Sequence, residues 1–196
     1  MSKASPIKLI AGLGNPGPEY EGTRHNAGQQ YVEALAIRHQ APLKLESKHK
    51  AFVSKALIAG SSCFLVVPTT FMNSSGQAIA SLATFYKVLP DEILVAHDEL
   101  DLPCGRARFK IAGGHGGHNG LRDTIQCLAK RQDFCRLRIG IDHPGQANKV
   151  ASYVLKRAPS QDQQKIDDAI ACAVDSTEAF VGGDREAAMR ELHSKT

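Results

Sequence analysis

The feature that most constrains the fold is a short apolar run at the centre of the chain. Residues 92–98, EILVAHD, contain four consecutive apolar residues and then end in His97 and Asp98. Such a run is typical of a strand inside a parallel sheet whose two faces are both covered. We therefore expect a central strand here with helices on both sides of the sheet. His97 and Asp98 should point to opposite faces, and we expect His97 to be structural.

The rest of the chain alternates strand-like and helix-like segments. Residues 59–62, AGSS, have the composition of a hairpin turn between two strands. The pattern predicts one domain over residues 1–196, a three-layer α/β/α sandwich around a twisted, mixed and mostly parallel sheet. Strands are predicted at 7–14, 51–58, 63–68, 92–98, 105–111 and 134–141, and helices from 26 onward, at 73–88, 118–130 and 160–181, and from 184.

Composition excludes several classes of protein. Apolar residues make up 42% of the chain and charged residues 22%, which is ordinary for a globular protein. We find no run of about 18 apolar residues that could span a membrane, and the N-terminal segment lacks the apolar stretch of a signal peptide. The cysteines are odd in number and form no CxxC pair, which favours a reducing compartment. We expect a cytoplasmic protein.

Positive charge is concentrated in the central third of the chain. Residues 101–157 carry 11 Lys and Arg against four Asp and Glu, whereas the remainder carries 13 against 16. A basic patch attracts polyanions, of which nucleic acid is the commonest. A solvated charged face would give the same composition, so this observation alone leaves both interpretations open.

Two glycine-rich segments raise the question of a cofactor or a metal. Residues 12–17, GLGNPG, match the GxGxxG pattern, but flanking prolines and the absence of a suitably placed acidic residue argue against a dinucleotide. Residues 112–123, AGGHGGHNGLRD, contain His115 and His118 but no third His or Cys. A metal site needs three or four ligands, so we expect neither a metal nor another cofactor.

Polar side chains stand at the ends of four predicted strands. Asn15 follows the first, Asn73 the third and Asp98 the central one, and the loop after the basic strand 105–111, GRARFKI, carries His118 and Asn119. Ligands of open α/β sheets bind beyond the carboxyl ends of the strands, so we expect these residues to gather at one rim. Each of them alone could be a turn or cap residue, but their joint placement favours a binding site.

His25 is the candidate catalytic group. It lies in TRHNAG, directly before a predicted helix and near the exit of the first strand. The positive end of that helix is expected to keep the ring neutral, and a neutral imidazole with an ordinary pKa near 6.5 suits a general base. Asp98 could orient the ring by accepting its other N–H. The charged neighbours of His39, His49 and His193 predict surface positions.

Five ordered segments together resemble the bacterial-type peptidyl-tRNA hydrolase family. They are GLGNPGPEYEGTRHNAG, PTTFMNSSGQA, HDELDLP, GGHGGHNGLRD and RLRIGI, and the resemblance spans nearly the whole chain. It implies a compact, monomeric α/β domain that cleaves the ester between a peptide and the 3′ end of tRNA, recycling tRNA from aborted translation. It also implies that the reaction uses no metal and no covalent intermediate.

The resemblance implies roles for individual residues. His25 would be the general base and Asp98 its orienting carboxylate, while Asn15 would help to distinguish peptidyl-tRNA from aminoacyl-tRNA. Asn73 and Asn119 would bind the peptide main chain and the tRNA end. The other implied residues flank the site, support it or hold tRNA phosphate; they are Tyr20, Phe71 and Met72, then His118, then Lys110 and Arg138.

Two positions depart from the family pattern. Asp142 stands where glycine is usual in IGIDHPG, and Cys104 stands where proline often follows LDLP. Both lie in loops outside the expected chemistry, but Asp142 adds a negative charge near the basic strand and so bears on tRNA affinity. Two other functions remain open from the residues themselves: a non-enzymatic RNA-binding module, and a general esterase that does not require tRNA.

Overall fold

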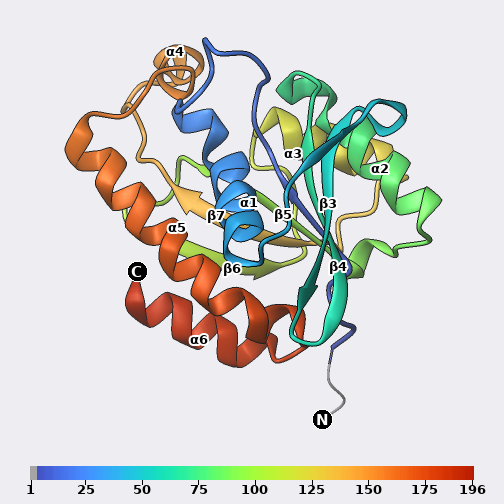
Figure 1. The fold of residues 1–196 in the computed structure, drawn as a ribbon. Helices are drawn as coiled ribbons and strands as arrows, with labels where there is room; N and C mark the ends of the chain where they lie inside the picture. The colour runs from blue at the N-terminus through green and yellow to red at the C-terminus, as the bar shows by residue number, and fades with distance from the viewer. Residues whose placement is uncertain (1–3) are drawn as a thin grey trace.

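The structure, a computed structural model, describes residues 4–196. These residues form one seven-stranded sheet in the order β2-β3-β4-β1-β5-β7-β6, with helices on both faces (Figure 1). The strands are β1 (Leu9–Gly12), β2 (Lys44–Glu46), β3 (Ala51–Ile58), β4 (Ser61–Pro68), β5 (Ile93–Glu99), β6 (Ala107–Ile111) and β7 (Cys135–Gly140). The helices are α1 (Ala27–Arg38), α2 (Ser75–Phe85), α3 (Asn119–Cys127), α4 (Val150–Val154), α5 (Ser160–Val181) and α6 (Arg185–Lys195).

The sheet is mixed, as the sequence predicts. Its centre, β4-β1-β5-β7, is parallel, while β3 and β6 run antiparallel to the neighbouring strands β4 and β7. The carboxyl ends of the four central strands therefore meet at one rim. Asp98, near the end of β5, lies at that rim together with Asn15 and Asn73, which follow β1 and β4 in the sequence.

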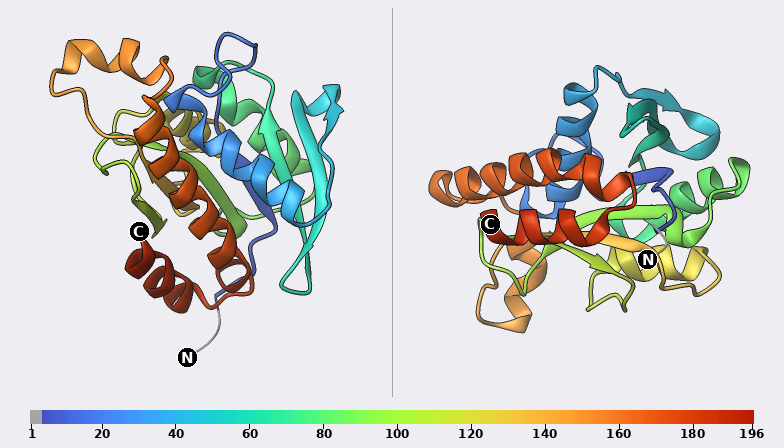
Figure 2. Two further views of the ribbon diagram at one scale, coloured as in Figure 1. Left: turned by 60° about the vertical axis from the view of Figure 1, so that its left-hand side comes forward. Right: turned by 90° about the horizontal axis from the view of Figure 1, so that it is seen from below.

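The two faces of the sheet bury separate hydrophobic cores. Leu94 and Ala96 of β5 pack with α1, α5 and α6, whereas Ile93 and Val95 pack with α2 and α3. Successive side chains of a strand point to opposite faces, so the ILVA run supplies both cores at once. Figure 2 shows α5 and α6, coloured orange and red, side by side on one face. The predicted three-layer architecture is confirmed.

Some local expectations need correction. The hairpin turn is Ala59–Gly60, both at positive φ (51° and 74°), so β4 begins at Ser61, two residues before the predicted strand. A two-residue turn of this kind matches the twist of the flanking strands. His49 is buried beneath α2, and its Nδ1 lies 2.7 Å from Ser81 Oγ, so the predicted surface position was wrong. Its polar neighbours in sequence did not reveal this tertiary partner.

The five cysteines differ in their burial. All five cysteines are free thiols; Cys63 and Cys135 are buried, and burial raises the pKa of Cys63 to about 12. Within residues 4–196, no helix combines the length and the apolar character that crossing a membrane requires.

Close contact between α1 and the ends of β1 and β5 positions the rim. A Cβ added to Gly28 would lie 2.1 Å from the Ala96 main-chain oxygen, and one added to Gly12 would lie 2.3 Å from the Gly28 oxygen. Only glycine allows these backbones to approach so closely. Because His25 precedes Gly28 by three residues and Asp98 follows Ala96 by two, this contact sets the distance between His25 and Asp98.

Gly28→Ala tests this contact. Alanine is the better helix former by about 1 kcal/mol, yet its methyl group would overlap the Ala96 oxygen, so we expect the free energy of unfolding to fall by about 3 kcal/mol. Urea unfolding measures the change. Gly114→Ala is the matched control, because its Cβ meets nothing within 4 Å, and it should stay within about 0.5 kcal/mol of wild type. Equal stability of the Gly28 variant and wild type would contradict the packing argument.

Candidate active site

The centre of the site is the buried carboxylate of Asp98, at the end of β5. His25 Nδ1 lies 2.9 Å from Asp98 Oδ1 and 3.0 Å from Oδ2, and His118 Nε2 lies 2.8 Å from Oδ1. His25 comes from the 3₁₀ turn η1 (Arg24–Asn26) before α1, and His118 comes from the glycine-rich loop before α3. His25 and Asp98, the pair predicted from the sequence, are therefore in contact, and His118 is a second histidine bonded to the same carboxylate.

The hydrogen bonds fix the tautomer of His118. Its Nδ1 accepts the main-chain N–H groups of Gly120 and Leu121 at 3.2 and 3.4 Å, and so caps the N-terminus of α3. A nitrogen that accepts hydrogen bonds carries no proton, so the ring proton is on Nε2 and is donated to Asp98. His118 therefore ties the start of α3 to the carboxylate that holds His25.

His25 bonds to Asp98 through its other ring nitrogen, Nδ1 instead of Nε2. Its Nδ1 donates to Asp98, which leaves Nε2 as the acceptor, and Nε2 has no hydrogen-bond partner among residues 4–196. His97 lies on the other face of β5, as predicted, where it is fully enclosed and donates from Nδ1 to the Asp98 main-chain oxygen at 2.7 Å. Burial lowers the pKa of His97 to about 3, so this ring is neutral and structural.

The ionisation of the pair differs from the sequence expectation. Burial lowers the pKa of His25, but the charge and hydrogen bond of Asp98 outweigh burial and raise that pKa above its ordinary 6.5. Burial raises the pKa of Asp98, but the two histidines lower it well below its ordinary value, so Asp98 is ionised. The carboxylate, and not the helix end considered from the sequence, therefore sets the protonation of His25.

Two hydrogen bonds fix the position of Asn15, which lines the same hollow as His25. Its Oδ1 accepts the Met72 N–H at 2.7 Å, and its own N–H donates to Asn26 Oδ1 at 2.8 Å. Because Oδ1 must face the Met72 N–H, the Nδ2 donor faces away, and no hydrogen-bond partner for it exists in the described part of the chain. Asn26 is a residue that the sequence reasoning missed; its place one residue after His25 was the only signal.

The predicted substrate residues gather in one hollow of about 340 Å³ next to His25. Tyr20 and Phe71 meet edge to face across 6.1 Å. Asn119 begins α3 and accepts from Arg122 through Oδ1, so its amide nitrogen remains available. The lining includes seven of the residues predicted from the sequence, namely Asn15, Tyr20, His25, Phe71, Met72, Asn73 and Asn119.

The predicted phosphate contacts lie apart from this hollow, on β6 and β7. Lys110 is exposed, whereas Arg138 donates from Nε to Glu99 Oε2 at 2.9 Å. Two neighbouring arginines of β6 and β7 are engaged within the protein. Arg136 is buried and donates to the main-chain oxygens of Phe134 and Gly113, and Arg108 donates to the main-chain oxygen of Thr196.

The two departures from the family pattern lie in contact with each other. The Cys104 N–H donates to Asp142 Oδ2 at 3.3 Å, and Asp142 has a φ of 63°, a conformation that glycine adopts most easily. The negative charge of Asp142 is thus directed at the Cys104 loop. Burial, with the adjacent Asp142 carboxylate, raises the pKa of the Cys104 thiol to about 12.

Three groups at the centre have the chemistry of metal ligands. Ligand atoms of His25, Asp98 and His118 lie within 4.8 Å of one another, a group different from the His115 and His118 pair considered in the sequence. The nitrogen of His118 that faces Asp98 carries the ring proton, because its Nδ1 caps α3. Metal binding there would need that proton to move and the cap to break, so the hydrogen-bonded arrangement disfavours a metal.

The whole architecture matches solved structures. The crystal structure of peptidyl-tRNA hydrolase from Acinetobacter baumannii superposes with a TM-score of 0.95 and 44% sequence identity, covering 100% of this chain and 99% of that one. Relatives named peptidyl-tRNA hydrolase, from Teredinibacter turnerae and Saccharophagus degradans, are each 57% identical over 190 residues. These matches span 97% of this chain and 98% and 96% of the two relatives, and they place the chain among the hydrolases.

The family follows from a third comparison. A family model described as Peptidyl-tRNA hydrolase matches residues 9–196, nearly the full length. The chain belongs to the peptidyl-tRNA hydrolase family. The resemblance inferred from five sequence segments is therefore confirmed.

Asp98→Asn tests the electrostatic account of His25. Without the negative charge, burial remains and lowers the pKa of the ring, so we expect the pKa of His25 to fall below 6.5 instead of lying above it. The pH dependence of the His25 ring resonances in NMR spectra measures both values. Asp133→Asn, at an exposed ion pair with Arg131, is the control and should leave the titration of His25 unchanged. A His25 pKa that stays above 6.5 in Asp98→Asn would refute the account.

Proposed function

We propose that this hydrolase cleaves the ester between a peptide and the 3′ end of tRNA with His25 as the general base. One observation carries the proposal: Asp98 holds His25 Nδ1, while Nε2 is left unpaired beside a hollow lined by three asparagines, Asn15, Asn73 and Asn119. A base needs a free, correctly oriented nitrogen next to the substrate. The asparagines supply the amide groups that a peptide main chain requires.

The reaction would proceed through a water molecule. His25 Nε2 takes a proton from water as the water oxygen attacks the ester carbonyl, and Asp98 stabilises the imidazolium that forms. When the tetrahedral intermediate collapses, the C–O bond to the ribose breaks and His25 returns the proton to the ribose oxygen. General-base catalysis contributes about 10²- to 10⁴-fold, which suits an ester with a ribose leaving group.

Asn15 is the proposed donor to the reacting carbonyl. Its Oδ1 is occupied by the Met72 N–H, so the unpaired Nδ2 is the group left for the substrate. A fixed donor next to a developing oxyanion stabilises the transition state without reorganising. We propose that Asn73 and Asn119 pair with the peptide main chain, which makes binding independent of the peptide's side chains, and that Tyr20, Phe71 and Met72 flank the ester.

The RNA part of the substrate is proposed to lie along β6 and β7. Lys110 would bind a phosphate directly. Arg138 is paired with Glu99, so a phosphate would have to share or replace that carboxylate.

A substrate made in translation places this activity in the cytoplasm. All the side chains of the proposed site come from one chain, so a monomer suffices.

His25→Ala tests the base. Hydrolysis of N-acetyl-aminoacyl-tRNA, followed by release of free tRNA, should show kcat reduced by two to four orders of magnitude with little change in KM. His39→Ala, at the other end of α1, is the matched control and should retain wild-type activity. Retention of more than a tenth of wild-type kcat by His25→Ala would remove His25 from this role.

The same assay separates the two alternative functions. An RNA-binding module would protect the ester and release no tRNA, even as the wild-type chain. A general esterase would hydrolyse a small ester at a rate comparable to that of N-acetyl-aminoacyl-tRNA. Our proposal requires release of tRNA and slow turnover of the small ester.

Lys110→Ala tests the RNA path. Loss of one phosphate contact should raise KM and reduce the slope of log KM against log salt by about 1. Lys44→Ala is the control, because β2 and β6 are the opposite edges of the sheet. If the salt slope of Lys110→Ala equals that of wild type, the tRNA follows another path.

A further inference from the structure

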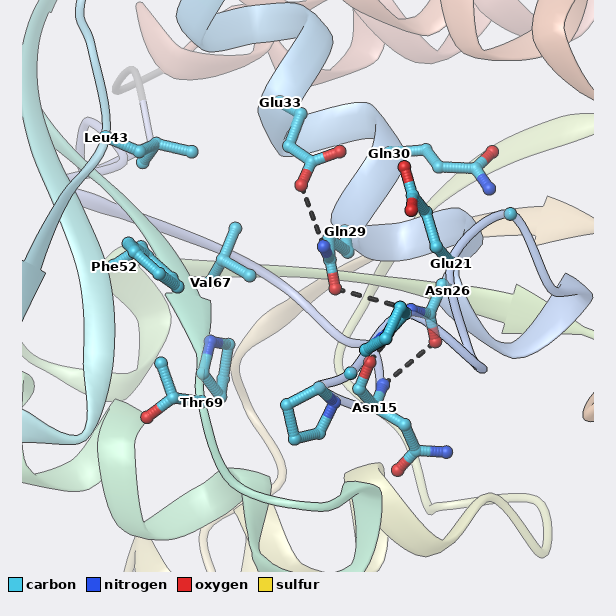
Figure 3. A pocket seen from close by; sticks show the side chains of 15 residues that line it. Asn15, Glu21, Asn26, Gln29, Gln30, Glu33, Leu43, Phe52, Val67 and Thr69 are labelled. Atoms are coloured by element: carbon cyan, nitrogen blue, oxygen red, sulfur yellow. Dashed lines mark hydrogen bonds between the residues drawn. The ribbon is translucent and has the colours of Figure 1, made fainter.

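A second and larger hollow adjoins the proposed site on the far side of Asn15. It has a volume of about 700 Å³, within the range of ligand-binding clefts. Figure 3 shows it between α1 on one side and the β3–β4 hairpin on the other. Asn15 lines both this groove and the hollow next to His25, so the two are neighbours through one residue.

The two walls of the groove differ in chemistry. The hairpin side is apolar: Phe52 is 41% exposed, and Val67 lies beside it in the groove. The α1 side is polar and acidic, with Gln29 donating from Nε2 to Glu33 Oε1 at 2.7 Å. Glu21 adds a second carboxylate (Figure 3).

Both carboxylates are without a cationic partner in residues 4–196. Neither Glu21 nor Glu33 forms an ion pair, and Arg157 bonds to the main-chain oxygen of Glu21 and not to its carboxylate. In a chain whose net charge is +4, this acidic groove stands apart from the basic strands β6 and β7. Its charge repels RNA phosphate and attracts a cation.

We propose that this groove binds the peptide part of peptidyl-tRNA, upstream of the ester, and favours Lys or Arg at about the fourth residue from the tRNA. The inference rests on the proposed function, which puts the ester beside His25 and Asn15. The peptide must leave that point in some direction, and the groove offers an apolar wall for side chains together with amide groups for the main chain.

Helix α1 allows the distance from the ester to Glu33 to be estimated. Asn26, which holds Asn15, precedes Glu33 by seven residues, which corresponds to about 10 Å along a helix. An extended peptide covers that distance in about three residues at 3.3–3.6 Å each. The residue bonded to tRNA lies at Asn15, so the third residue beyond it reaches Glu33. A cationic side chain there would meet Glu33, and Glu21 lines the same groove; neither carboxylate has a cationic partner among residues 4–196.

The test compares N-acetylated tetrapeptidyl-tRNAs that differ in one residue. The three residues nearest the tRNA are alanine, and the fourth is Lys or Glu. We expect wild type to favour the Lys substrate in kcat/KM by about three- to tenfold, as exposed charge pairs allow. Glu33→Gln combined with Glu21→Gln should remove most of this preference, and 0.5 M salt should weaken it in wild type. Glu186→Gln on α6 is the matched control and should keep the preference.

The outcomes separate this inference from the proposed function. Wild-type hydrolysis of N-acetyl-alanyl-tRNA, which is too short to reach Glu33, tests the function alone. If that substrate and both tetrapeptides are hydrolysed equally well, the function stands and the groove does not bind the peptide. A Lys preference that persists in the double variant also overturns the inference, because the charge that selects the peptide would lie elsewhere. If no peptidyl-tRNA is hydrolysed, the proposed function fails first.

Discussion

The buried carboxylate of Asp98 is the interaction on which the site depends. It accepts from His25 and His118, which are 93 residues apart in the chain, and its main-chain oxygen accepts from His97. Removing an ionised carboxylate from water is costly unless it is paired and hydrogen-bonded. The hydrogen bonds from His25 and His118 therefore stabilise the charge, and the charge in turn orients His25 and raises its pKa.

The backbone makes that cluster of side chains feasible. Gly12 and Gly28 allow α1 to lie against the ends of β1 and β5, which brings η1 to the rim. His118 serves two structures at once, since it caps α3 and donates to Asp98. The glycine-rich loop, the start of α3 and the Asp98 carboxylate are therefore joined by hydrogen bonds into one unit. The asparagines Asn15 and Asn26 form a second unit, which lies between the site and the acidic groove of α1.

Sequence patterns predicted the parts of this protein that depend on local order. The ILVA run of β5 and the alternation of strands and helices predicted the three layers, and strand ends predicted which polar residues would gather at the rim. Predictions failed where a distant partner decides the outcome. His49 is buried against α2, where its Nδ1 lies 2.7 Å from Ser81 Oγ, and the buried Arg136 donates to the main-chain oxygen of Gly113, 23 residues earlier in the chain. The pKa of His25 is set by a carboxylate 73 residues away.

The sequence by itself determined the family, the fold class and the pair His25 and Asp98, because periodicity, strand ends and motif order are properties of the chain. Tertiary structure alone decided three other things: the tautomer of His118, the orientation of the Asn15 amide and the acidic groove beside it. Each of these depends on which atoms face one another across elements distant in sequence. Hydrogen bonds and charges act over a few ångströms, so only the folded chain specifies them.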